Sequence, residues 1–427
     1  MTTISTGPLA DQPRMEPGRR LPAVPRAVWF AVGAVLLLSV SRVLSGADNL
    51  TSSGTFSAAL RLAVPIGLPG LGGLWAERTG VVNIGLEGMM ILGTWFGAYG
   101  GVEFGPWWGV VLGIVGGGLG GLIHAVATVR FGVDHVVSGV AINILGAGAA
   151  RYLSVTFFTP MQGGGANQSP RVSGGIPDID LPFLAGGFDT PDILGRIARW
   201  RWFVVSDVAA VLRAFTGNLS VLTILTFVLF GLTIWVLWHT PFGLRLRSAG
   251  EHPWGAESLG VNVLRMKYIG VVVSGMFAGL AGAFLVLEAA GIYREGQTGG
   301  RGFIGLAALV FGNWRPVGVA AGAALFGFAD ALQLRSSQAV HALLLFVALV
   351  CLVGFVAAVL RRKALQAVLL ALAGVAFLVW YLASDVVPSQ FVFFTPHLTT
   401  LLVLAFATQR LRPPAADGIP YRKGDTH

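Results

Sequence analysis

The chain has 427 residues, of which 54% are hydrophobic and only 11% charged, and its formal net charge at pH 7 is +9. Because a typical soluble domain carries about 25% charged residues, this composition excludes an ordinary string of soluble domains. A P-loop ATPase is also excluded, since that motif needs a lysine directly after a glycine, and none of Lys267, Lys363 and Lys423 follows one. The single cysteine, Cys351, rules out an internal disulfide.

Long apolar runs recur between residues 27 and 409, each close to the ~20 residues that a helix needs to cross a ~30 Å hydrocarbon layer. The pattern predicts an all-α polytopic membrane protein with about 10–12 transmembrane helices. The stretch 302–313 is too short to cross alone and is predicted to be a half-helix. In chain order, the predicted spans are 27–45, 56–75, 81–100, 106–128, 135–158, 217–239, 268–290, 302–313, 317–334, 340–360, 364–384 and 391–409.

Charge placement predicts how the chain is threaded through the membrane. Residues 1–26 are polar, basic and rich in proline, without the apolar core of a cleaved signal peptide, and are predicted to be a disordered cytoplasmic tail. With this end inside, the short inner loops hold most of the Lys and Arg, as the positive-inside rule requires. The transmembrane domain is then 27–410, and the tail 411–427 is cytoplasmic as well. The basic charge therefore reflects membrane topology, and nucleic acid is not an expected partner.

A large extracytoplasmic loop is predicted at 159–216, where five arginines balance five aspartates. Asp189-Thr190-Pro191 looks like a helix start, with cap residues ahead of a proline in the first turn. The stretch up to Trp202 is then predicted to lie along the membrane surface. Two interpretations stay open, a solvated loop and a docking face for another protein.

A polar inner segment is predicted at 240–267. Pro253 suits the first turn of a short helix over Trp254–Leu259, and Gly260 suits its end. A short rigid helix in this place can transmit force to a cytoplasmic partner. The alternative is an ordinary basic loop.

Polar side chains inside the predicted spans are candidate functional residues, because they are costly in lipid. Asn83 and Glu87 are four positions apart in the span 81–100 and are predicted to share one helix face. That face either lines a polar cavity or forms a structural hydrogen-bonded pair between helices. Further candidates of this kind are Asn143, Glu288, Asp330 and Gln333.

Other polar groups in the spans have simpler expected roles. Arg61 and Arg151 lie near span ends and are predicted to snorkel or to pair, whereas His124 and His341 are predicted to pack in the core. No arrangement of Ser, His, Asp, Glu or Cys suggests a catalytic centre or a metal site. The sequence therefore predicts no enzyme activity for this chain.

Four collinear stretches resemble one family when they are taken together. They are 71–93 (LGGLWAERTGVVNIGLEGMMILG), 242–268 (FGLRLRSAGEHPWGAESLGVNVLRMKY), 299–318 (GGRGFIGLAALVFGNWRPVG) with 326–335 (FGFADALQLR), and 412–421 (RPPAADGIPY). They are similar to permease subunits of ATP-binding cassette (ABC) importers in the branched-chain amino acid, ribose and nucleoside group. The nucleoside branch, linked to basic membrane lipoproteins, resembles them best.

The resemblance implies an import subunit of a bacterial plasma membrane that performs no chemistry and binds no cofactor itself. It implies a second homologous permease as heterodimer partner, cytoplasmic P-loop ATPase subunits that bind ATP and Mg²⁺, and an extracytoplasmic substrate-binding lipoprotein. The segment 240–267 would be the cytoplasmic coupling segment, docked on the ATPase through Gly243, Arg247, Gly250, Glu251, Ala256 and Gly260. The substrate pathway would include Asn83 and Glu87, with Asn143 as a further candidate and with Thr298 and Arg301 at the outer mouth.

Two features depart from the resemblance. Residues 343–390 look like an inserted helical hairpin hinged at Arg361-Arg362-Lys363, and Glu288 stands where an uncharged residue is expected. The predicted function is the import of nucleosides. A permease for ribose-like simple sugars is the alternative, and an ion-coupled secondary transporter is the second alternative.

Overall fold

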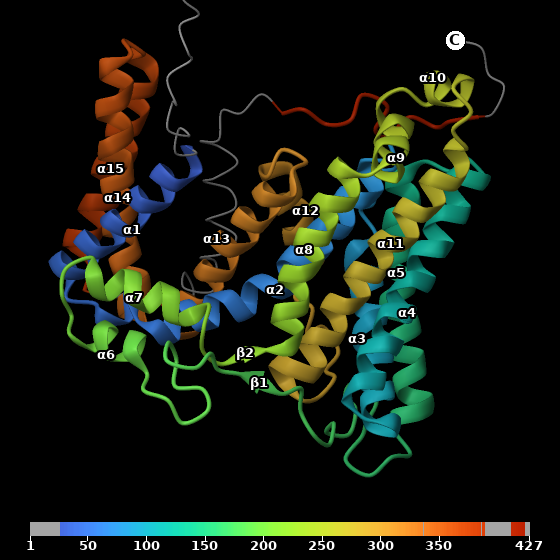
Figure 1. The fold of residues 1–427 in the computed structure, drawn as a ribbon, viewed down its shortest axis with the longest axis horizontal. Coiled ribbons are helices and arrows are strands. Elements are labelled where there is room, and N and C mark those ends of the chain that lie inside the picture. Colours follow the sequence, from blue (N-terminus) through green and yellow to red (C-terminus); the bar gives the residue numbers. More distant parts are fainter. Residues whose placement is uncertain (1–25, 336, 386, 389–410, 423–427) are drawn as a thin grey trace, which may run out of the picture.

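The computed structural model describes residues 26–335, 337–385, 387–388 and 411–422, and it is mostly helical (Figure 1). The long helices are α1 (Arg26–Ser45), α2 (Ser53–Glu77), α3 (Leu86–Phe104), α4 (Pro106–Ala125), α5 (His135–Leu153), α8 (Val221–His239), α11 (Val263–Phe284), α13 (Pro316–Arg335), α14 (Ser337–Leu360) and α15 (Ala364–Ala383). Turns of π-helix extend α4, α5 and α11 through Val126–Arg130, Ser154–Phe158 and Leu285–Ala290. The shorter helices are α6 (Ile193–Arg199), α7 (Val205–Ala214), α9 (Pro241–Glu251), α10 (Pro253–Ser258) and α12 (Arg301–Phe311), with a 3₁₀ turn at Asp48–Thr51. Strands β1 (Asp178–Ile179) and β2 (Leu219–Ser220) pair antiparallel.

The prediction of an all-α polytopic membrane protein is confirmed. Within the described residues, eight helices are long and apolar enough to cross a membrane. Each predicted span before residue 391 corresponds to a helix, and the predicted half-helix at 302–313 is α12, only 11 residues long. The predicted span 391–409 and nearly all of the N-terminal tail lie outside the described residues.

The third predicted span needs a correction. The helix α3 begins at Leu86 rather than at residue 81, so Asn83 and Glu87 do not share a helix face. Gly80 has a φ of +79°, which ends the preceding turn, and the Asn83 side chain binds the backbone amide of Gly85. A short amide side chain that bonds to its own backbone competes with helix formation, which explains the delayed start.

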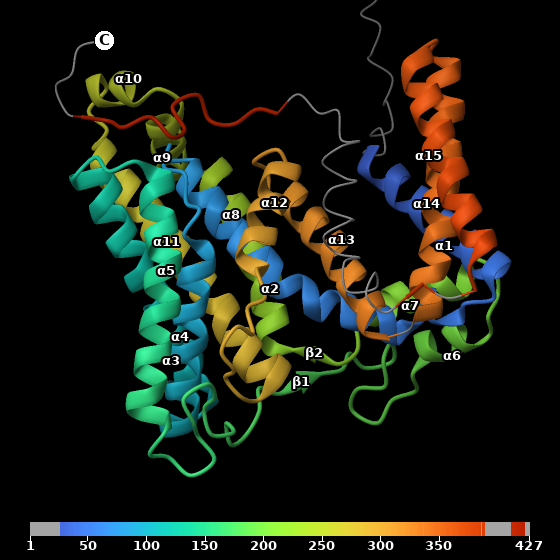
Figure 2. The same cartoon turned by 180° about the vertical axis from the view of Figure 1, so that it is seen from behind.

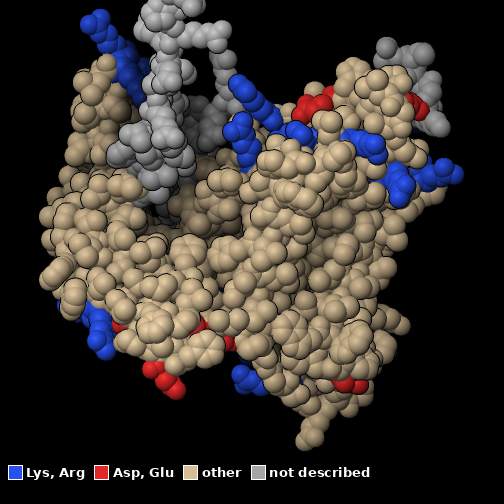
Figure 3. Space-filling view, in the orientation of Figure 1, with Lys and Arg blue, Asp and Glu red and all other residues tan. Residues whose placement is uncertain are grey.

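The two ends of the molecule differ in structure. Helices α9 and α10 and the segment 411–422 lie at one end, here called the α9–α10 end (Figures 1 and 2). Strands β1 and β2 with α6 and α7 lie at the other, the β1–β2 end. On the face drawn in Figure 3, charged side chains gather at these two ends, and Lys and Arg dominate the α9–α10 end. The broad band between the ends is uncharged on this face, as expected for a surface that contacts lipid.

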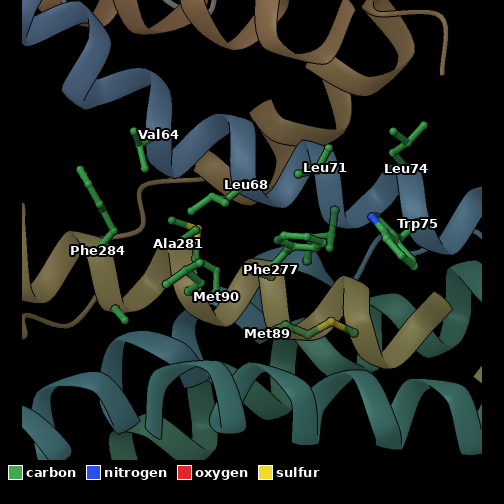
Figure 4. Packing of buried hydrophobic residues seen from close by; sticks show 14 of the residues in the cluster. Val64, Leu68, Leu71, Leu74, Trp75, Met89, Met90, Phe277, Ala281 and Phe284 are labelled. Atoms are coloured by element: carbon green, nitrogen blue, oxygen red, sulfur yellow. The ribbon is translucent and has the colours of Figure 1, made fainter. Parts of the chain in front are cut away.

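The main hydrophobic core lies where α2, α3, α4 and α11 pack together. In Figure 4, Leu68 and Leu71 of α2 face Phe277 and Ala281 of α11. Glycines let these backbones touch: a methyl group placed on Gly93 of α3 would lie 2.5 Å from the Cα of Gly279. Close approach at small residues is the usual basis of helix association in membranes, where the hydrophobic effect between helices is weak.

A second group of helices, α1, α14 and α15, lies apart from this core (Figure 1). The helices α14 and α15 form a hairpin whose turn passes through Arg362 with a φ of +56°. Only 6% of the apolar stretch of α15 that is long enough to cross a membrane is buried within the chain. This hairpin therefore leaves most of α15 available to lipid or to another protein.

The loop 159–216 contains two helices that pack against each other, and the second of them also packs against α2 and α1. Helix α6 begins at Ile193, capped by Asp192, whose Oδ1 accepts the Gly195 amide at 2.6 Å. The predicted helix start at 189–191 is thus within three residues of the observed one. Helix α7, which the sequence analysis did not anticipate, buries Asp207 and pairs it with Arg42 of α1 at 3.1 Å.

Candidate functional site

The chain enters α3 through an irregular, largely buried segment at 80–85. Asn83 is fully buried there, and its Oδ1 accepts the Gly85 amide at 3.0 Å. Its Nδ2 donates to the Ser274 hydroxyl of α11 at 2.9 Å. Backbone groups outside a helix need protein partners at membrane depth, and Asn83 supplies one of them.

Asn143 of α5 holds the start of α3 from another side. Its Oδ1 accepts the Gly88 amide at 2.7 Å, and its Nδ2 donates to the carbonyl of Ile84 at 3.1 Å. Both hydrogen bonds satisfy backbone groups at the beginning of the helix, where internal partners are missing.

Glu87, in the first turn of α3, caps the start of α12. Its carboxylate oxygens accept the amides of Gly300 at 3.0 Å and of Gly302 at 2.7 Å, and the residue is 7% exposed. An anionic group at a helix N-terminus is stabilised by the unpaired amides and by the helix dipole. A methyl group placed on Gly302 would lie 2.6 Å from the Glu87 Cα, so glycine permits this contact.

Arg301, the first residue of α12, joins this helix to α13. Its Nη2 lies 2.9 Å from Oδ2 of Asp330, and its Nη1 donates to the carbonyl of Thr298 at 3.3 Å. Thr298 is buried at 3% exposure. The Arg301 guanidinium thus has two protein partners, the Asp330 carboxylate and the Thr298 carbonyl, and only a fifth of its side chain is exposed.

The start of α12 lies deep in the helical bundle. A methyl group placed on Gly305 would lie 2.9 Å from the carbonyl oxygen of Ile66, near the middle of α2. A helix that begins at such a depth exposes polar backbone groups, which are tolerated only inside protein or along an aqueous path. We call this polar region the α3–α12 seam, and it comprises Asn83, Glu87, Asn143, Thr298, Arg301 and Asp330.

The seam brings together all five residues that the sequence predicted for the substrate pathway. The side chains of Asn83, Asn143 and Glu87 bond to backbone groups at the starts of α3 and α12, so the seam links the starts of two short or delayed helices. Ser274 also contributes, and it was not among the predicted residues, because a serine within an apolar run is common in membrane helices. Within the described residues, no His, Cys, Asp and Glu side chains are grouped to hold a metal ion.

Two other predicted polar residues are paired elsewhere. Arg61 of α2 lies 3.3 Å from Glu288, which is why a carboxylate is tolerated at that depth, and Arg151 lies 2.6 Å from Glu295. Predicted pairing of both arginines is therefore confirmed. His124 is fully buried and lies 2.8 Å from the Ser138 hydroxyl, so it packs in the core as predicted.

Helices α9 and α10 are short, are capped at their starts and, at the glycines of α9, pack directly against neighbouring backbone. Thr240 Oγ1 accepts the Gly243 amide at 3.1 Å, and His252 Nδ1 accepts the Gly255 amide at 2.9 Å. Helix α10 ends at Ser258, and Gly260 follows with a φ of +82°. The predicted short helix after Pro253 is confirmed, and these caps fix its orientation.

The six residues predicted for ATPase coupling fall into two groups. Gly243, Gly250 and Ala256 are buried, and methyl groups on the two glycines would overlap the carbonyl oxygens of Val236 and Arg78. These three therefore position α9 and α10 and do not form their outer surface, which corrects the expectation for them.

The remaining three coupling candidates lie at or near the surface. Arg247 stacks over the Trp238 ring at 5.5 Å, and the half-exposed Glu251 pairs with Arg78 at 3.4 Å. Gly260 is exposed. Leu259, which follows α10, was not among the predicted residues. It is 86% exposed and is the most exposed large apolar side chain of the segment 240–267.

A polar cavity of about 620 Å³ lies at the β1–β2 end, away from the seam. Its walls come from α1, α6 and α7 and include the pairs Arg42–Asp207 and Arg213–Asp192. The pair Arg42–Asp207 holds the loop 159–216 to α1, whereas Arg213–Asp192 lies within the loop. Trp200 and Trp202 remain more than half exposed.

The profile of the family described as "Branched-chain amino acid transport system / permease component" matches residues 55–356. The chain belongs to this family. The matched region contains the whole α3–α12 seam and helices α9 and α10. It ends inside α14, so α15 and the segment 411–422 lie beyond it.

Named relatives of this permease are transport proteins of the same kind. It is 34% identical over 374 residues to the guanosine ABC transporter permease protein NupQ of Bacillus subtilis, covering 86% of this chain and 96% of NupQ. It is 29% identical over 370 residues to the nucleoside ABC transporter permease protein NupC of Lactococcus lactis, covering 84% and 94%. It is 32% identical over 289 residues to the putative glucose ABC transporter permease protein TsgC13 of Haloferax volcanii, covering 67% of this chain and 79% of TsgC13. No solved structure matches the chain.

Proposed function

We propose that this permease is the membrane subunit of an ABC importer for nucleosides. The structural observation that carries the proposal is the α9–α10 pair, a rigid, capped element that projects Leu259 from one end of a bundle of apolar helices. Such an element suits the transfer of movement from a partner to the helices. Nucleosides are proposed as substrate because the relatives that match the most of this chain are named for guanosine and nucleosides.

The α9–α10 end is proposed to face the cytoplasm. Lys and Arg gather there on the face in Figure 3, in agreement with the positive-inside rule. Both termini would then be cytoplasmic. The ATPase subunits, with their ATP and Mg²⁺, would dock on α9 and α10, and a binding lipoprotein would deliver substrate at the β1–β2 end. A second homologous permease would complete the pathway as a heterodimer.

The α3–α12 seam is proposed to border the substrate pathway. Helix α12 is only 11 residues long, and it is held at its start by Glu87 and Arg301. A short helix of this kind can shift as a unit when the coupling helices move. Asn83, Glu87, Asn143, Thr298 and Arg301 would then control access through the seam.

A permease for simple sugars is the second candidate, because the relative TsgC13 is named as a putative glucose transporter permease. Uptake of radiolabelled guanosine, uridine, glucose and ribose distinguishes the two, measured in a strain that lacks the gene and in the complemented strain. Loss of nucleoside uptake alone supports the proposal, whereas loss of glucose or ribose uptake alone supports the second candidate.

An ion-coupled secondary transporter predicts a different result. Uptake would then persist without ATP and would collapse with the ion gradient. Purification of the tagged permease from membranes tests this point further, since an ABC importer is expected to bring a P-loop ATPase with it.

A further inference from the structure

We infer that residues 411–422 form a working part of the coupling apparatus, which we call the C-terminal strap. The inference rests on the proposed function, since it concerns how movement of α9 and α10 reaches the α3–α12 seam. The strap lies across the α9–α10 end, after α15 in sequence but beside α9 and α10 in space (Figures 1 and 2). The strap lies outside the part of the chain that the family profile matches, because that part ends at residue 356.

The strap is bound directly to both coupling helices. The Ala416 amide donates to the Gly250 carbonyl at 2.9 Å, and the Ala415 amide donates to Oε2 of Glu251 at 3.1 Å. Further along, the Tyr421 hydroxyl donates to Oε2 of Glu257 in α10 at 2.5 Å. The Tyr421 ring also packs against Trp254 with its centroid 6.1 Å away. These contacts make α9, α10 and the strap one connected unit.

The same strap is bound to the ends of other helices. The Arg412 amide donates to the Asn313 side chain, in the turn after α12, at 2.7 Å. The Asp417 carboxylate lies among Glu77 of α2, Arg78 and Lys267 of α11. Ala416 is 4% exposed, and a methyl group on Gly80 would lie 2.9 Å from its carbonyl oxygen. Most of the strap is exposed, but Pro414, Ala416 and Tyr421 are buried, so the strap is anchored to the protein at several points.

Arg78 and Trp314 complete the connection to α12. Arg78 donates from Nη2 to the Trp314 carbonyl at 2.5 Å and pairs through Nη1 with Glu251 of α9 at 3.4 Å. The Trp314 indole N–H donates to the Glu77 carboxylate. Trp314 follows the end of α12, and Glu87 holds its start. Because α12 is a rigid rod of about 16 Å, a displacement at Trp314 is carried to the seam.

The strap thus lies at the meeting point of three elements that must move together in a coupled importer. It connects α10, where the ATPase would dock, with the turn that follows α12. Tyr421 and Glu257 are positioning residues in this scheme, because they touch neither ATP nor the substrate. Loss of their contact should weaken the link between ATP hydrolysis and uptake without removing either partner.

The test uses the complete importer, with its ATPase and binding protein, in membrane vesicles. The quantity measured is the number of guanosine molecules taken up per ATP hydrolysed. For Tyr421→Phe, which removes only the hydroxyl, we expect this ratio to fall about tenfold at unchanged chain abundance and ATPase association. Glu257→Gln keeps an acceptor for the hydroxyl and should stay close to the wild type. Tyr152→Phe, at a 70% exposed tyrosine of α5, is the matched control.

A pair of deletions provides the second measurement. Deletion of 423–427 leaves the strap in place and should not change the ratio, whereas deletion of 412–427 should abolish coupled uptake while ATP hydrolysis continues. A wild-type ratio in Tyr421→Phe would overturn the inference. A parallel loss of uptake, hydrolysis and abundance in that variant would also overturn it, since that is what a purely structural contact predicts. If the wild type itself shows no ATP-dependent uptake of guanosine, uridine, glucose or ribose, the proposed function fails first, and the strap's role with it.

Discussion

The Glu87 carboxylate of α3 accepts the Gly302 amide of α12 at 2.7 Å, so a buried side chain in the first turn of one helix caps the start of another. The segment before α3 enters the bundle from the α9–α10 end, and the segment before α12 enters from the β1–β2 end. Leu86 and Gly302, at the two helix starts, are buried, so amides there need partners inside the protein. The contact therefore fixes the relative position of two elements that would otherwise be free to separate.

Replacing Glu87 tests whether this cap is needed. Glu87→Ala removes two hydrogen bonds to a charged acceptor, each contributing about 1.5–3 kcal/mol, and leaves the two amides buried without a partner. We expect the permease in detergent to unfold at a lower temperature, and uptake per assembled complex to fall by more than about tenfold. Glu87→Gln keeps one carbonyl oxygen as an acceptor. Its unfolding temperature and its uptake per assembled complex should both fall less than those of Glu87→Ala. Uptake by Glu87→Ala at the wild-type level would contradict a role for the seam in transport.

The Arg301–Asp330 pair offers a separate measurement. Removal of one partner from a largely buried ion pair leaves an uncompensated charge and costs on the order of 3 kcal/mol. We expect Arg301→Ala and Asp330→Ala each to destabilise the protein, and the double variant to be less destabilised than the sum of the two. Thermal unfolding of the three variants in detergent gives the coupling energy. Strict additivity would show that the two side chains act independently.

The sequence predicted the seam's residues but not their arrangement. Glu87 and Asn143 were identifiable because lipid penalises polar groups, and that penalty is visible in a single sequence. The non-helical segment 80–85 before α3 could not be identified from the sequence. Hydrophobic residues continue through it, and only Gly80 and Asn83 interrupt the helix. A periodic pattern does not reveal a break made by one glycine and one side-chain hydrogen bond.

The C-terminal strap shows a different limit. Tyr421 and Glu257 are 164 positions apart and meet only in the folded protein. Residues 411–427 are predicted only as a cytoplasmic tail, and the backbone of 411–422 is irregular. Its partners are set by the positions of α9, α10 and α12, which no local pattern in the tail encodes.

Leu259 provides a test of ATPase docking. It is 86% exposed at the end of α10, so a charged side chain there should be tolerated by the fold. We expect Leu259→Glu to reduce the amount of ATPase that purifies with the permease, with membrane abundance unchanged, because a desolvated carboxylate opposes an apolar interface. Leu259→Met, which preserves size and polarity, is the control. Normal ATPase recovery with Leu259→Glu would place the docking surface elsewhere on the α9–α10 end.

Asp417 makes the strap sensitive to pH. Burial raises the pKa of its carboxyl from 3.8 to about 7, and the neighbouring Arg78 and Lys267 only partly oppose this effect. The Glu77 carboxyl of α2 also faces it. Since the folded pKa lies above the unfolded one, the proton is held more tightly in the folded protein. The contribution of Asp417 to strap stability is therefore complete below pH 3.8 and is lost as the pH rises to about 7.

Hydrogen exchange of the amides in 411–422 measures this dependence. Protection factors, which remove the intrinsic effect of pH on exchange, should be higher at about pH 6 than at about pH 8. Asp417→Asn keeps the size of the side chain but stays neutral, so its protection factors should differ less between the two pH values than those of the wild type. Amides in the buried part of α11 serve as the internal reference, because global unfolding would change them as well. The same pH dependence in the wild type and in Asp417→Asn would assign the effect to another group at the α9–α10 end.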